Sequence, residues 1–114
     1  MNESLIPATN NVCGYIYCGN NIVQVKVVLL RTFGIDNNDV SMNHGLLKIK
    51  LPAMELEVKR KDEERWSVNA AVAGDNPVVV DVITGFAQQL KWSGFSSNYE
   101  IYNDQFECIK TIDM

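Results

Sequence analysis

Apolar residues alternate with polar ones along much of this chain, and this spacing predicts β-strands. The clearest stretch is residues 47–58, where every second side chain is apolar on either side of Pro52. The apolar positions have odd numbers before Pro52 and even numbers after it, as one inserted residue would cause. We therefore predict one long strand with a bulge or bend at Pro52. Through a charged tip at residues 59–65, it should pair with a returning strand from Trp66 to about Ala73.

Two further strands are predicted near the start of the chain. Residues 12–18 are rich in aromatic and β-branched residues, and residues 19–21 follow with glycine and two asparagines, which indicates a hairpin. Residues 22–30 alternate apolar positions with glutamine and lysine, so a strand is the first interpretation there. The length of this segment and the apolar run at its end leave a helix as the alternative.

One helix is predicted over residues 76–92. Asp75 or Asn76 is placed to cap its first turn, and Pro77 suits the first helical position. Gly94 follows as a residue that can end the helix in the left-handed conformation. Apolar residues recur three or four positions apart, as on the buried side of an amphipathic helix. They are Val79, Val82, Ile83, Phe86 and Leu90.

The chain finishes with a predicted hairpin. A two-residue turn at Asn103 and Asp104 would place Tyr99 opposite Cys108. Together the elements predict a single α+β domain over residues 1–114. We expect a mostly antiparallel sheet of about six strands, built from hairpins, with one amphipathic helix (about 76–92) on one face.

The N-terminal residues 1–11 are polar and are predicted to be poorly ordered. They show neither the basic start nor the apolar stretch of a signal peptide, so we expect a cytoplasmic protein. No apolar run approaches the length of a membrane span, and we expect no membrane contact. The odd number of cysteines, Cys13, Cys18 and Cys108, argues against a disulfide framework.

The net charge of −4 makes nucleic acid an improbable partner, because phosphate backbones attract basic surfaces. The surplus of acidic residues is uneven, since the charged tip at residues 59–65 has four basic and three acidic side chains. Residues 99–114 instead hold four acidic side chains and one lysine. The final hairpin is therefore the most acidic part of the chain.

Residues that could carry catalysis or hold a metal are scarce. His44 is the one histidine, and no serine or cysteine near it in the sequence has the setting of a nucleophile. Asp36 and Asp39 could contact a cation, but a turn in which they cap their own backbone explains them better. No glycine motif for phosphate binding occurs. We therefore expect no catalytic residues, no metal, no cofactor and no enzymatic activity.

Three segments could contact a partner protein. The first is the final hairpin, where acidic residues alternate with tyrosines that could anchor a basic partner. The second is the loop predicted at residues 32–45, with a short helical turn after Asp36 as an option. The third is the charged tip with Trp66 at its base as an aromatic anchor. The candidate binding residues are Tyr99, Glu100, Tyr102, Asp104, Glu107, Asp36, Asp39 and Trp66.

Size, charge and the lack of catalytic groups predict a protein-binding domain. The first hypothesis is an inhibitor of the immunity or antitoxin kind, monomeric or homodimeric, that covers the active site of a basic, nuclease-like toxin or effector. The alternative is a structural or assembly module, such as a secretion chaperone or a phage accessory or particle protein, that works by homo-oligomerisation. A small-molecule-binding fold, with a pocket between helix and sheet, is the third hypothesis.

Overall fold

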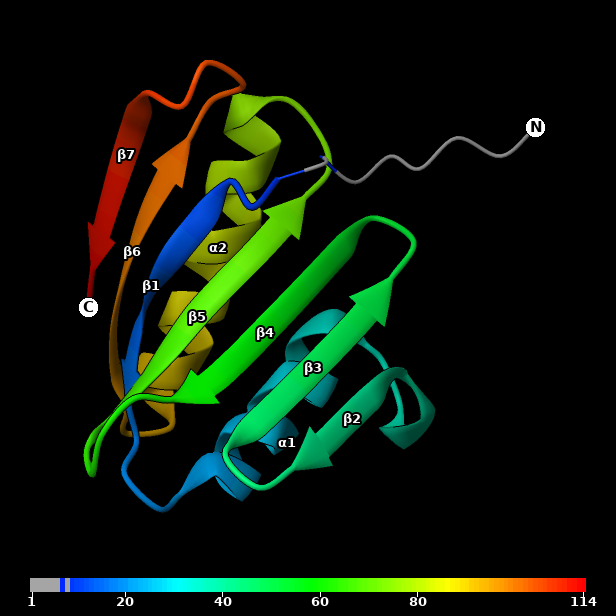
Figure 1. Cartoon of the computed structure of the whole chain (residues 1–114), viewed down its shortest axis with the longest axis vertical. Coiled ribbons are helices and arrows are strands. Elements are labelled where there is room, and N and C mark those ends of the chain that lie inside the picture. Colours follow the sequence, from blue (N-terminus) through cyan, green and yellow to red (C-terminus); the bar gives the residue numbers. More distant parts are fainter. Residues whose placement is uncertain (1–6, 8) are drawn as a thin grey trace.

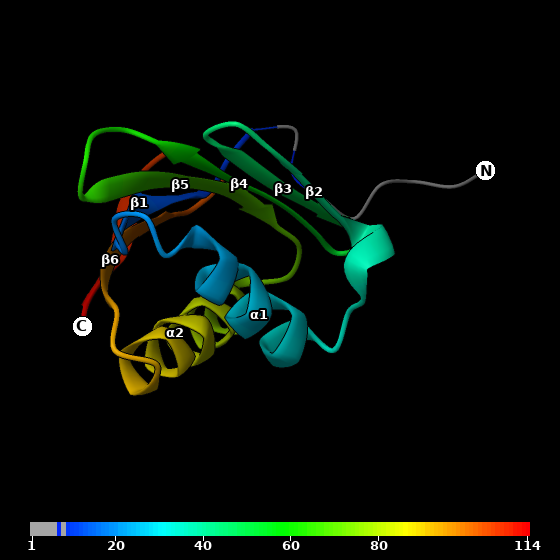
Figure 2. The same cartoon turned by 90° about the horizontal axis from the view of Figure 1, so that it is seen from below.

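Seven strands form one antiparallel sheet, and two helices lie side by side on one of its faces (Figure 1 and Figure 2). The computed structural model describes Pro7 and residues 9–114. Its elements are β1 (Val12–Tyr17), α1 (Ile22–Phe33), the short 3-10 helix η1 (Asn37–Asp39), β2 (Val40–Asn43), β3 (Leu46–Leu51), β4 (Met54–Arg60), β5 (Arg65–Val72), α2 (Asn76–Trp92), β6 (Ser96–Tyr102) and β7 (Cys108–Asp113). The predicted α+β class is confirmed, with one strand and one helix more than expected.

The first strand of the chain lies in the middle of the sheet. The strand order is β2-β3-β4-β5-β1-β6-β7, so Cys13 of β1 pairs with Asn69 of β5 and with Glu100 of β6. Gly14 allows β1 and β6 to approach closely, because a Cβ atom there would overlap the carbonyl oxygen of Asn98. The sheet therefore joins segments that are more than 80 residues apart in the sequence.

Helix α1 occupies the segment for which a strand was the first interpretation, so that prediction is wrong. Val25, Val28 and Leu29 are buried, and their spacing places them on one side of the helix. The valine-rich sequence satisfies both spacings, since residues 23–29 also alternate. β-branched residues weaken a helix by only a few tenths of a kcal/mol each, a cost that packing overrides. Gly34 ends α1 in the left-handed conformation, with a φ of 62°.

A two-residue turn at Pro52 and Ala53 joins β3 to β4, and the predicted continuous strand with a bulge is wrong. Leu51 and Met54 lie opposite each other across this turn. Directly opposed residues of an antiparallel pair point to the same face, so a tight turn exchanges odd and even positions just as an inserted residue does. The hairpin with the charged tip is confirmed as β4 and β5, with β5 ending at Val72.

The terminal hairpin is confirmed as β6 and β7, but its predicted turn is too short. Tyr102 pairs with Cys108, so residues 103–107 make the connection, and Tyr99 lies opposite Ile112. Two other connections differ from expectation. Residues 19–21 lead into α1 instead of a hairpin, and the segment predicted as a loop contains η1 and the edge strand β2.

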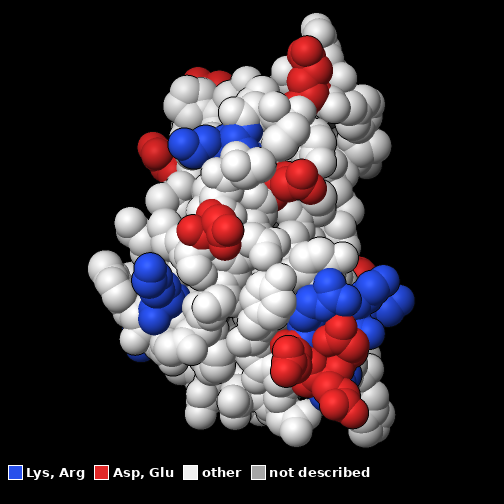
Figure 3. All heavy atoms as spheres, turned by 90° about the vertical axis from the view of Figure 1, so that its left-hand side faces the viewer, with Lys and Arg blue, Asp and Glu red and all other residues white. Residues whose placement is uncertain are grey.

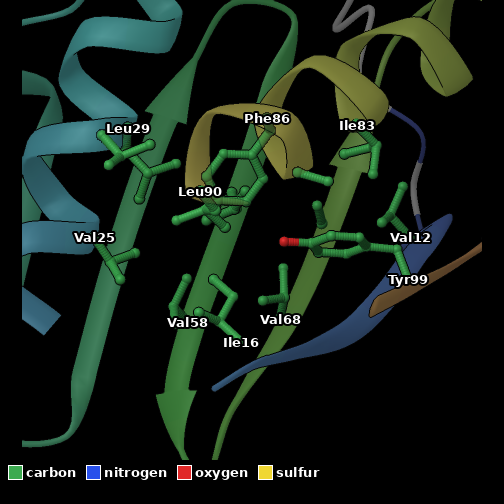
Figure 4. Close-up of a cluster of buried hydrophobic side chains, with 14 of the residues drawn as sticks. Val12, Ile16, Val25, Leu29, Val58, Val68, Ile83, Phe86, Leu90 and Tyr99 are labelled. Atoms are coloured by element: carbon green, nitrogen blue, oxygen red, sulfur yellow. The ribbon is translucent and has the colours of Figure 1, made fainter. Parts of the chain in front are cut away.

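Helix α2 confirms the prediction over residues 76–92. The side chain of Asp75 accepts a hydrogen bond from the N–H of Val78, and Pro77 lies in the first turn. Gly94 has the expected positive φ, and Phe95 is buried against the end of the helix. The buried side of α2 meets valines and isoleucines of the sheet in one core (Figure 4). The core residues at its centre include Ile16, Leu29, Val58, Val68, Ile83, Phe86, Leu90 and Tyr99.

The predicted poor order of residues 1–11 falls mostly on residues 1–6 and 8, which lie outside the described residues. Asn11 is held on both sides of its side-chain amide. Its Nδ2 donates to the carbonyl oxygen of Val72 and its Oδ1 accepts from the N–H of the same residue, both at 2.9 Å. The three cysteines are free. None of the helices in the described part of the chain has the length and apolar content needed to cross a membrane.

Candidate functional site

The face of the sheet opposite the helices is open, and its side chains fall into two groups (Figure 2). On β3 and β4, lysines stand opposite glutamates. The Nζ of Lys48 lies 3.7 Å from Oε2 of Glu57, and the Nζ of Lys50 lies 3.7 Å from Oε1 of Glu55. We call these outward side chains the ladder half. Its charges cancel within the protein, so it offers little net attraction to a charged partner.

The outward side chains of β1, β6 and β7, together with the turn at residues 103–107, form what we call the acidic half. Cross-strand pairing sets Cys13 beside Glu100 and Thr111, and sets Tyr15 beside Asn98 and Asp113. These six side chains line one hollow of the open face. The acidic half therefore brings together residues from both ends of the chain.

The acidic side chains of this half are not neutralised by nearby cations. None of the ion pairs formed among the described residues includes Glu100, Asp104, Glu107 or Asp113. Figure 3 views the molecule from the β7 side. Acidic side chains are spread over its upper part around one basic group, whereas the mixed cluster at the lower right is the tip between β4 and β5. The negative charge of the acidic half remains available to a partner.

Aromatic and polar groups surround these acids. The Nδ2 of Asn98 donates to the hydroxyl of Tyr17 at 3.1 Å, and the guanidinium of Arg65 lies 5.0 Å from the ring centre of Tyr15. The thiol of Cys13 donates to Oε1 of Glu100 at 3.8 Å. Tyrosines fixed in this way lose little conformational freedom when they bind, which makes them effective interface residues.

The ionisable groups at the centre of the acidic half are neutral at physiological pH. Burial first, and then the charge of Glu100, raise the pKa of the Cys13 thiol. Burial, followed by the charges of Cys13 and Glu100, raises the pKa of Tyr102 to about 12. A reactive cysteine needs a lowered pKa, so this arrangement favours binding over nucleophilic chemistry.

The turn between β6 and β7 presents an exposed aromatic ring. The Oδ1 of Asn103 accepts hydrogen bonds from the N–H groups of Gln105 and Glu107, both at 2.9 Å, and its Nδ2 donates to Oε1 of Glu107 at 3.0 Å. Phe106 has a φ of 61° and is 67% exposed. A bulky residue is strained in the left-handed region, and such strain gathers at binding sites. The turn thus holds Phe106 between two acids, Asp104 and Glu107.

Two of the predicted binding residues are buried and cannot contact a partner. Tyr99 is 1% exposed, its ring centre lies 6.0 Å from that of Phe86, and burial raises the pKa of its phenol well above the usual range. Trp66 is 3% exposed, and its indole N–H donates to the carbonyl oxygen of Gly19 at 2.7 Å. Both anchor the fold, because their side chains point to the helix-covered face.

The predicted residues of the 32–45 segment lie at the other edge of the sheet. The side chain of Asp36 accepts from the N–H of Asn38 at 2.8 Å, and the side chain of Asp39 accepts from the N–H of Asp36 at 3.4 Å. They form a capping box around η1, the role that favoured the turn interpretation. His44 is exposed in the turn between β2 and β3. No group of acids, cysteines and histidine among the described residues could hold a metal ion.

Of the predicted binding residues, the structure gathers Glu100, Tyr102, Asp104 and Glu107 on one hairpin. Sequence reasoning did not assign the outward residues that complete this surface. These are Tyr15, Tyr17, Phe106 and Asp113. The two tyrosines alternate with Gly14 and Ile16, which gives their face, but only the pairing of β1 with β6 brings them to the acids.

Comparisons with known proteins found no matching family model, no similar curated protein and no similar solved structure.

Proposed function

We propose that the protein is a small inhibitor of the immunity or antitoxin kind. It neutralises a basic, nuclease-like toxin or effector by laying the acidic half over the active site of that partner. A site that binds nucleic acid must be basic, because it faces phosphates. An acidic protein surface competes for the same groups, and opposite charges speed the encounter of the two proteins.

One observation supports this proposal most directly. The turn at residues 103–107 is closed by its own hydrogen bonds and exposes Phe106 between Asp104 and Glu107, beside the uncancelled acids of β6 and β7. An aromatic ring held rigidly among acids is suited to an apolar pocket with a basic rim. Aromatic anchors of this kind supply much of the binding energy at protein interfaces.

Affinity capture from the native cell, followed by a binding assay with the captured protein, tests the proposal. We expect a single basic protein in a complex that weakens with salt. Reversal of charge in E100K/D104K/E107K should reduce its affinity by on the order of 100-fold, because three attractive contacts become repulsive. The matched control D81K/E63K/E64K makes the same change of net charge on α2 and on the β4–β5 tip, and should leave affinity nearly unchanged.

Inhibition is measured separately with the purified partner. The protein should suppress the partner's activity on nucleic acid at stoichiometric amounts, and the triple reversal should relieve this suppression. Capture of no basic protein, or equal loss of affinity in both triple variants, would contradict the proposal. Self-association at high concentration without a partner would instead support the assembly module.

A further inference from the structure

The outer side of α1, which faces away from the sheet, carries an apolar stripe. Val23 is 58% exposed and Val27 is 52% exposed, while Leu30 in the next turn is half-buried. Positions 23, 27 and 30 are four and three residues apart, so they lie along one side of the helix. The opposite side holds the buried Val25, Val28 and Leu29. α1 is therefore apolar on both sides, unlike an ordinary surface helix.

The nearby end of α2 extends this stripe. Trp92, its last residue, is 75% exposed, the highest value among the exposed large apolar residues. Nη2 of Arg31, near the end of α1, donates to Oγ of Ser93 at 3.4 Å and so links the two helix ends. Figure 2 shows both helices on the same side of the molecule, away from the open face of the sheet.

The charges around this stripe are basic, although the protein as a whole is acidic. α1 contains Lys26 and Arg31 and no acidic residue, and Lys91 precedes Trp92. The closest acids that follow α1, Asp36 and Asp39, are engaged in the capping box around η1. Asp81 is the one acidic residue within α2. We call Val23, Val27, Trp92, Lys26, Arg31 and Lys91 the helix patch.

We infer that the helix patch docks on an anionic lipid surface. Exposed valines and a tryptophan would enter the headgroup region while three cations contact lipid phosphates, as in other interfacial helices. This inference goes beyond the proposed inhibitor function, since it concerns the opposite side of the molecule. It also departs from the expectation of no membrane contact, which rested on the lack of a spanning segment.

The charges decide against a second copy of the chain as the occupant. Packing two α1 helices along this stripe would bring Lys26 and Arg31 of each copy to the same seam. α1 offers no acidic side chain to pair with them. Like charges along a helix seam oppose pairing. An anionic surface has the complementary sign.

The shape of the patch favours a bilayer over a partner helix. A helix partner is usually held in a groove. The three hollows described for this molecule lie on the open face of the sheet and beside the β6–β7 turn, and no patch residue lines them. A bilayer needs no groove, because its headgroups deform around side chains that project from a helix.

Vesicle sedimentation with the full chain tests the inference. The probes are vesicles of phosphatidylcholine alone and of phosphatidylcholine mixed with phosphatidylglycerol. We expect binding to the mixed vesicles that weakens with salt, and little binding to phosphatidylcholine alone. Tryptophan fluorescence gives a second readout, because Trp92 is exposed and Trp66 is buried. Emission should shift to shorter wavelength on binding, and the W92F variant should lose that shift.

Variants separate the charge of the patch from its apolar stripe. Each neutralised cation should weaken partitioning about fivefold, so K26Q/R31Q/K91Q should lose on the order of 100-fold. The control K48Q/K50Q/K110Q removes the same charge from the sheet strands and should lose little. V23S/V27S should reduce binding to the mixed vesicles while leaving thermal unfolding nearly unchanged, since both valines are more than half exposed.

Three outcomes would overturn the inference. One is absence of binding to the mixed vesicles at low salt. Another is equal binding to both kinds of vesicle, or an equal loss in the two triple lysine and arginine variants. The third is self-association in solution that V23S/V27S abolishes, which would make a second copy the occupant. E100K/D104K/E107K should retain vesicle binding, so failure of the inhibitor proposal would remain distinguishable.

Discussion

The ladder half and the acidic half belong to the same open face, yet they treat charge in opposite ways. On β3 and β4 each lysine has a glutamate across the strand pair, so the charges satisfy one another. On β1, β6 and β7 the acids stand beside tyrosines, and the ion pairs of the described residues leave them out. The ladder half keeps the sheet solvated. The acidic half leaves an attraction unspent, which a partner can use.

Gly14 gives the largest expected difference, because it lies where β1 joins the rest of the acidic half. Gly14→Ala should destabilise the protein by about 3 kcal/mol or more, since the new methyl group would overlap the β6 backbone, which cannot move aside easily. Urea unfolding measures this change. Gly85→Ala in α2 is the matched control, and it should stabilise by about 0.5–1 kcal/mol because its Cβ meets no atom within 4 Å. Equal stability of the two variants would show that β1 is not tightly joined to β6.

Phe106 should separate binding from stability. Phe106→Gly relieves the left-handed strain and should raise the free energy of unfolding by up to about 1 kcal/mol. The same change removes the exposed ring and should weaken binding to the captured partner by at least about 2 kcal/mol. Thermal unfolding and a binding titration give the two values. A variant that binds normally would remove Phe106 from the interface.

Asp62, at the charged tip beside the ladder half, should report on pH. Its carboxylate accepts hydrogen bonds from the N–H and the guanidinium of Arg65, which lower its pKa from 3.8 to about 2. A lowered pKa adds stability above pH about 4, which is lost as the pH falls towards about 2. The difference in thermal midpoint between the wild type and Asp62→Asn should therefore shrink over that range. A constant difference would show that the carboxylate charge does not matter.

The ladder itself should give the smallest effect. Glu57→Gln breaks one exposed ion pair and should change stability by less than about 1 kcal/mol, because water competes for both partners. Partner affinity should stay within about twofold, in contrast to reversal in the acidic half. Denaturant unfolding and the same binding assay test both values. A large loss of affinity would mean that the partner spans the whole open face.

The sequence predicted those parts of the fold that have local signals. α2 has a cap, a proline in its first turn and a terminal glycine, and its predicted limits agree with the structure. α1 lacks such signals at its start, since Asn21 makes no side-chain cap, and its valines fit either spacing. The turn after Leu51 and a bulge at Pro52 produce the same alternation, so only the pairing of strands distinguishes them.

The candidate site was predicted in part for the same reason. Glu100, Tyr102, Asp104 and Glu107 are close in sequence, and a hairpin was sufficient to gather them. Tyr15 and Tyr17 reach them only through the order of the strands, which no local pattern encodes. Tyr99 was misplaced because the alternation within β6 puts it inward, and a sequence does not say which face of a sheet will be covered.

The central position of β1 has a consequence for how the chain folds. β1 leaves the ribosome first, but one of its two neighbours, β6, is made near the end of synthesis. Contacts between such distant segments slow folding, because a long loop must close before they form. β2 to β5 can pair as consecutive hairpins while synthesis continues. The acidic half closes last, so a nascent chain cannot engage its partner before the C-terminal hairpin has emerged.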